Sequence, residues 1–113
     1  MDRQAIYDKV KHHLLVAQPR KATSSEGGYE YQNDSGDRCA IGCLIPDDHS
    51  SLDDGHPVRS LLHNYPDLKE LWGVAEDTDM DFLEFLQNIH DRSPVCDWKK
   101  ELISVAKLFG LNP

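Results

Sequence analysis

Cysteine, long apolar runs and positive charge are all scarce in this 113-residue sequence. The longest uninterrupted apolar run, Leu14 to Ala17, is far shorter than the roughly 18 to 20 residues of a membrane span, and no signal-peptide apolar region follows the N-terminus. Three cysteines, an odd number without an export signal, suit a reducing cytoplasm better than a disulfide scaffold. These absences argue against a membrane protein and a disulfide scaffold, and we expect a cytoplasmic protein.

The shortage of positive charge is uneven along the chain. Twelve basic against 20 acidic side chains give a net charge of -8. Residues 26–91 contain sixteen acids and three bases, whereas residues 1–25 and 92–113 have small positive balances of +3 and +2. Such a field repels nucleic acids and membrane surfaces and attracts basic partners. We therefore expect direct binding of neither nucleic acid nor membranes, although solubility alone also explains an acidic composition.

The apolar spacing predicts one domain, residues 1–113, of class α+β but mainly α, with about five helices around one core. Asp2 is placed to cap a first helix that ends near Gln18, because Pro19 forbids its continuation. Residues 29–39 predict a small two-stranded β-hairpin, in which aromatic and polar residues alternate before an Asn-Asp-Ser-Gly turn. The predicted core comprises Ile6, Val10, Leu14, Ile41, Leu44, Leu61, Leu62, Leu71, Phe82, Phe85, Leu86, Ile89, Trp98, Leu102, Val105 and Phe109.

The most regular internal pattern predicts a helix from Thr78 to about Asp91. Thr78 and Asp81 resemble a capping box at its start. Opposite its apolar stripe, a row of polar residues recurs every three or four positions. A helix selected only for stability would alternate these acids with lysine or arginine, since like charges at this spacing are destabilising. The row contains no basic residue and consists of Asp77, Asp81, Glu84, Asn88 and Asp91.

Carboxylates one helical turn apart are separated by about 5 to 6 Å, comparable to successive phosphates on a nucleic-acid strand. The row therefore predicts a surface that imitates a phosphate backbone and binds the basic groove of a nucleic-acid-handling protein. A merely solvated acidic face is the competing interpretation. The expected partner-binding residues are Asp77, Asp81, Glu84 and Asp91, with Asp47, Asp48, Asp53 and Asp54 as a second patch.

Cysteine and histidine supply an alternative. Cys39, Cys43, His49 and His56 offer zinc ligands, but their spacing differs from the tight pairs of structural zinc sites, and the apolar neighbours of both cysteines favour buried thiols. Six histidines without a nucleophile signature, and the absence of the common phosphate-binding and hydrolase motifs, give no support for catalysis. We expect no enzyme activity and no cofactor.

The string from Arg38 to Asp47, RCAIGCLIPD, resembles one found in short uncharacterised proteins of bacteria and their phages, as does an Ile-His-Asp segment, here Ile89 to Asp91, ahead of a final helix with an early Trp98. The resemblance implies a bacterial or phage origin and a place in the bacterial host cell, where small acidic proteins act as inhibitors of host or defence proteins. The resulting hypothesis is a non-catalytic acidic inhibitor; the alternative is a small regulatory thiol or zinc protein. A homo-oligomer joined through the basic ends and the acidic middle remains open.

Overall fold

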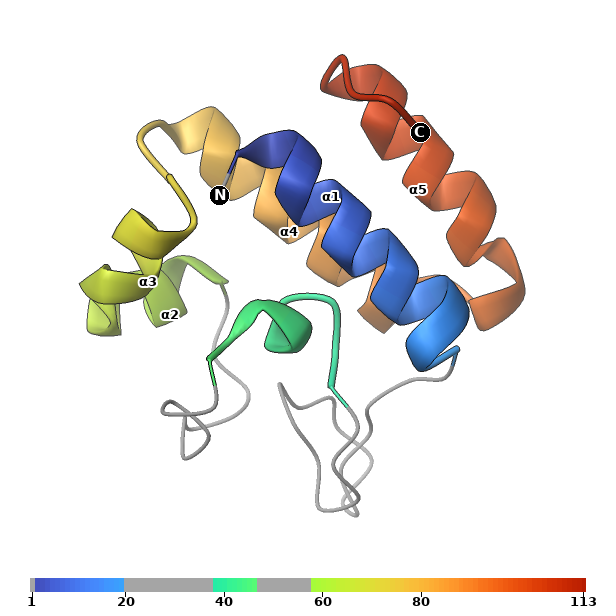
Figure 1. Cartoon of the computed structure of the whole chain (residues 1–113), viewed down its shortest axis with the longest axis horizontal. Helices are drawn as coiled ribbons and strands as arrows, with labels where there is room; N and C mark the ends of the chain where they lie inside the picture. Colours follow the sequence, from blue (N-terminus) through green and yellow to red (C-terminus); the bar gives the residue numbers. More distant parts are fainter. Residues whose placement is uncertain (1, 20–37, 47–57) are drawn as a thin grey trace.

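Helices make up most of the chain that the computed structural model describes, which is residues 2–19, 38–46 and 58–113 (Figure 1). Within these ranges, no helix combines the length and the apolar character needed to cross a membrane. The five α-helices are α1 (Arg3–His12), α2 (Val58–Asn64), α3 (Pro66–Leu71), α4 (Asp77–Arg92) and α5 (Trp98–Leu108). The shorter segments are the π-helix η1 (His13–Ala17) and the 3-10 turns η2 (Gly42–Leu44) and η4 (Val95–Asp97).

The expected α+β class is wrong, because the described ranges contain helices and no β-strand. Most of the predicted hairpin, residues 29–37, lies outside them. Its last two residues lead directly into η2, where the N–H of Cys43 donates to the carbonyl of Cys39 at 3.1 Å. The side-chain amide of buried Gln18 binds the backbone of Arg38 as a neighbouring strand would, accepting from its N–H at 2.7 Å and donating to its carbonyl at 2.8 Å. A side chain thus satisfies backbone groups that the prediction assigned to a β-ladder.

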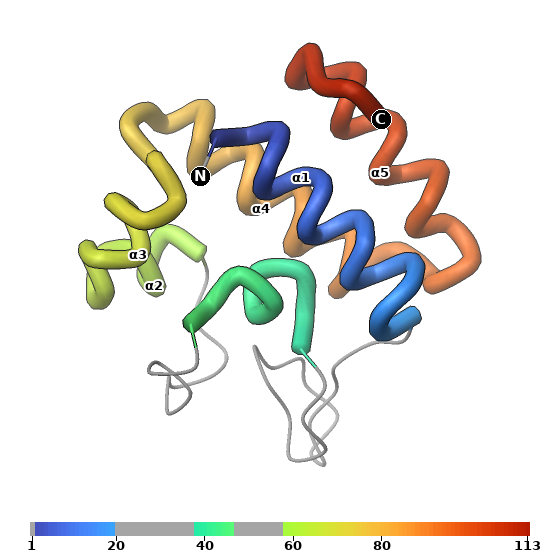
Figure 2. Tube along the Cα trace, in the orientation of Figure 1, coloured from blue at the N-terminus to red at the C-terminus, as the bar shows by residue number. Residues whose placement is uncertain are grey.

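Three helices form the body of the fold. In Figure 1, α1 crosses in front of α4, and α5 returns antiparallel to both; Figure 2 shows the same path as a tube. Arg3 joins the first turns of α1 and α4 through a 2.7 Å ion pair with Asp79. The Tyr7 hydroxyl donates to the Leu102 carbonyl of α5 at 3.1 Å. Helices α2 and α3 lie at one end, and η2 lies along the remaining side of α1.

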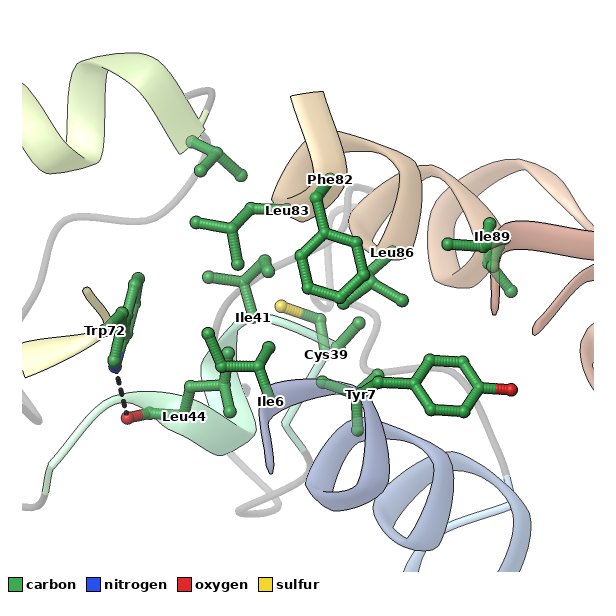
Figure 3. Close-up of a cluster of buried hydrophobic side chains, with 14 of the residues drawn as sticks. Ile6, Tyr7, Cys39, Ile41, Leu44, Trp72, Phe82, Leu83, Leu86 and Ile89 are labelled. Atoms are coloured by element: carbon green, nitrogen blue, oxygen red, sulfur yellow. Dashed lines mark hydrogen bonds between the residues drawn. The ribbon is translucent and has the colours of Figure 1, made fainter. Parts of the chain in front are cut away.

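The core fills the space between these helices and η2 (Figure 3). The indole of Trp72 is buried there and donates to the Leu44 carbonyl at 3.3 Å, joining α3 to η2. Two predicted core residues are exposed instead: Leu71 retains 48% of its accessible surface and Phe85 44%. At the end of α3, Trp72 lies four residues after buried Leu68 and occupies the same inward face of the helix. Leu71 therefore points outward. Tyr7, Leu68, Trp72 and Leu83 are core residues that the prediction omitted.

The helix ends follow local chemistry. Asp2 caps α1 as predicted, because its Oδ1 accepts the Ala5 N–H at 2.8 Å. The capping box of α4 lies two residues earlier than predicted, with Glu76 as the cap and Asp79 as its partner, and Asp79 Oδ2 accepts the Glu76 N–H at 3.1 Å. At the far end of α5, Gly110 has a φ of 69°, a left-handed conformation that suits glycine and terminates the helix.

Candidate functional site

The acidic row lies on the outer side of α4. The exposed fraction of the side chain falls along it, from 94% at Asp77 to 48% at Asp81 and 37% at Glu84. Asn88, one turn later, is also exposed. At 100° per residue these four positions share one stripe of the helix, so three carboxylates face solvent in line.

Arg59, projecting from α2, pairs with the three acids. Its guanidinium nitrogens are 2.7 Å from Asp81, 2.7 Å from Glu84 and 3.7 Å from Asp77. The row contains no basic residue of its own, yet its acids are paired. Spacing within α4 could not reveal this partner, because Arg59 belongs to a helix that ends before α4 begins. The four side chains together carry a net charge of -2.

Asp91 has a different role from the other acids of the row. Its Oδ1 accepts a hydrogen bond from His90 Nδ1 at 2.7 Å and another from Gln87 Nε2 at 2.9 Å. His90 is fully buried and stacks on Trp98, with 5.6 Å between the ring centroids. Asp91 is thus committed to positioning a buried histidine, although its side chain is still 27% exposed.

Gln87 connects the two segments on which the resemblance rests. Its Oε1 accepts the N–H of Ile41 at 3.1 Å, and its Nε2 donates to Asp91. The turn that contains both cysteines is therefore attached to α4 beside the Ile-His-Asp segment. These contacts form a polar seam inside the fold, which the sequence pattern did not reveal because Gln87 alone looks like an ordinary surface residue.

The two cysteines of this turn are held as thiols. Cys39 is fully buried, its Sγ accepts the Gly42 N–H at 3.2 Å, and burial raises its pKa to about 12. Cys43 is half-buried and donates to the Ala40 carbonyl at 3.0 Å; desolvation raises its pKa also to about 12. A thiol with so high a pKa is protonated at neutral pH, so neither sulfur is activated as a nucleophile. The arrangement agrees with the interpretation of these residues as buried thiols.

Two of the four ligands of the zinc alternative, Cys39 and Cys43, belong to the described residues. Across residues 2–19, 38–46 and 58–113, no group of three His, Cys, Asp or Glu side chains converges as metal ligands would. His49 and His56 lie outside the described residues, so the full predicted ligand set is not on view. The second acidic patch, Asp47, Asp48, Asp53 and Asp54, also lies outside them.

An apolar side chain adjoins the acidic row. Phe85 lies one turn beyond Asp81 and about 40° further round α4 at 100° per residue. Its ring meets the edge of Phe109 with 5.9 Å between the centroids, and its outer face is open to solvent. Leu108, the neighbour of Phe109 in sequence, is 64% exposed. This surface was not predicted, because helical spacing assigns Phe85 to the core, whereas 44% of its surface is exposed.

No protein-family model matches this chain, and neither a curated protein nor a solved structure gives a match.

Proposed function

We propose that this protein is a non-catalytic binding module that uses the outer face of α4 to block a basic protein surface. The observation that carries the proposal is the position of exposed Phe85 beside the acidic stripe of Asp77, Asp81 and Glu84. Protein interfaces combine an aromatic anchor that loses its contact with water and a polar rim that excludes wrong partners. The acids form such a rim, and their negative charge favours a partner whose surface is positively charged.

Charge complementarity favours a basic partner. Arg59 compensates one of the three carboxylates, and the excess of -2 lies within the most acidic part of the sequence. The ion pairs also hold Asp81 and Glu84 in fixed positions before binding, which reduces the entropy lost on association. A field of this sign accelerates encounter with basic surfaces, and salt weakens it.

The spacing of the carboxylates points to the class of partner. Exposed acids one turn apart imitate successive phosphates, so the surface suits the groove of a nucleic-acid-handling protein. The resemblance to bacterial and phage proteins favours a host or defence protein of this class. The imitation extends over Asp77, Asp81 and Glu84 and does not include Asp91, which is held against His90.

The test is affinity capture from a bacterial lysate with three versions of the chain. Replacing the acids of the row by lysine would place like charges against Arg59 and weaken the contact of α2 with α4. Neutral amides of nearly the same shape test the charge with less disturbance of the fold. Asp81→Asn with Glu84→Gln removes two charges from the row. Asp8→Asn with Glu70→Gln removes two charges from exposed positions on α1 and α3 and is the matched control.

We expect the wild type and the control to capture the same basic protein and the row variant to fail to capture it. Added DNA duplex should release the captured protein, because DNA and the row compete for the same surface. Arg59→Gln should tighten binding at low salt, since it makes the net charge of Arg59 and the three acids more negative, from -2 to -3. Equal capture by the row variant and its control would refute the acidic site. Capture that DNA does not displace would refute the imitation of phosphates.

A further inference from the structure

A second region of the molecule, between α1 and α5, has the form of a small ligand site. A cavity of about 240 Å³ lies there, with Tyr7 and Leu15 on one wall and Leu102 and Ile103 on the other. An apolar cavity of about 150 Å³ admits benzene, whereas drug-sized ligands need about 300 to 1,000 Å³. The space therefore suits one small molecule with a short apolar tail.

Two lysines line the same cavity. Lys11 lies one turn after Tyr7 on α1, and Lys99 lies one turn before Ile103 on α5. The helices are antiparallel and Tyr7 bonds to Leu102, so both lysines lie toward the same end of the pair. Along the helix axes, Lys11 is about 6 Å from Tyr7 and Lys99 about 4.5 Å from Leu102. Neither has an ion-pair partner in the described part of the chain. Two positive charges at one cavity repel each other, and an anion bound there would relieve that repulsion.

We propose that this cavity binds a small carboxylate with an apolar tail, in which the carboxylate lies between Lys11 and Lys99 and the tail extends toward Tyr7 and Ile103. A lysine ammonium is a compact charge that pairs with carboxylate oxygens in many geometries, so two of them hold one carboxylate without a rigid fork. The apolar walls favour an anion with an apolar tail over a fully polar anion such as sulfate. This site is independent of the acidic face of α4, and either proposal can fail alone.

The probe is octanoate, titrated into the full chain while backbone amide resonances are followed by NMR. Octan-1-ol keeps the tail and lacks the charge, and butanoate keeps the charge and shortens the tail. The variant Lys11→Gln with Lys99→Gln removes both ammonium groups from the cavity. Lys100→Gln with Lys107→Gln removes two exposed charges from α5 outside the cavity and is the matched control.

We expect octanoate to shift the amides of Leu15, Leu102 and Ile103 and to bind more tightly than either comparator. The cavity variant should bind it about tenfold more weakly, as two surface ion pairs imply, and the control within about twofold. Octan-1-ol should bind all three chains equally. The proposal is overturned if the cavity amides do not shift, if the cavity variant matches the control, or if octan-1-ol equals octanoate.

Discussion

Replacing Leu86 with alanine is expected to lower the free energy of unfolding by about 3 to 4 kcal/mol. Leu86 is fully buried on α4, among the side chains of Figure 3. The change removes three carbon atoms, worth about 0.8 kcal/mol each on transfer, or about 2.4 kcal/mol. The cavity left behind adds about 1 kcal/mol, since close-packed surroundings relax only in part.

The adjacent residue provides a matched comparison. Phe85 is 44% exposed, so its replacement by alanine leaves no enclosed cavity and removes mainly the edge contact with Phe109. Half-burial of the ring and this contact contribute about 1.5 kcal/mol to the free energy of unfolding. The higher helix propensity of alanine offsets about 0.5 kcal/mol of that loss. The expected loss is about 1 kcal/mol, roughly a third of the loss at Leu86.

Urea unfolding followed by circular dichroism separates the two variants. With a slope of about 1.5 kcal/mol per molar urea, the midpoint should fall by about 2 M for Leu86→Ala and about 0.7 M for Phe85→Ala. Equal shifts would refute the assignment of Phe85 to the open face of α4, and with it the apolar anchor of the proposed interface. A shift below about 0.5 M for Leu86→Ala would refute its position in the core.

Two further predictions concern titratable groups. Cys96 is exposed, whereas the pKa of both Cys39 and Cys43 is raised to about 12. Native protein should therefore react with one equivalent of a disulfide reagent at neutral pH, and unfolded protein with three. Rapid reaction of all three cysteines in the native protein would contradict the burial of Cys39 and Cys43. The backbone N–H of Ala75, together with the Arg3 guanidinium and the N–H of Glu76, holds the pKa of Asp79 below its ordinary value. Its contribution to stability is therefore present above the unfolded pKa of about 3.9 and is lost as the pH falls through the lower folded value. Asp79→Ala should cost about 1 to 2 kcal/mol at pH 7 and much less in acid, and a loss that does not depend on pH, in urea titrations, would count against this account.

The prediction was most accurate where one helix contains its own signals. The apolar stripe of α4 and the glycine stop of α5 depend on residues within about one turn of each other, and both are present. The capping box lies two residues earlier than predicted, and Arg3 contacts both Thr78 and Asp79 there from another helix. Local propensity does not include such contacts with a distant side chain.

The sequence alone determined the presence of several helices, an acidic middle and a row of carboxylates on one face of a helix, because periodicity and charge are properties of neighbouring residues. The α+β class expected from the same sequence was wrong. Only the tertiary structure decided what those carboxylates contact. It places Arg59 against three acids, holds Asp91 beneath a buried histidine and leaves Phe85 exposed where its apolar character predicted burial. Each of these outcomes depends on which elements lie beside α4, and such contacts between segments distant in sequence leave no periodic trace in the residues themselves.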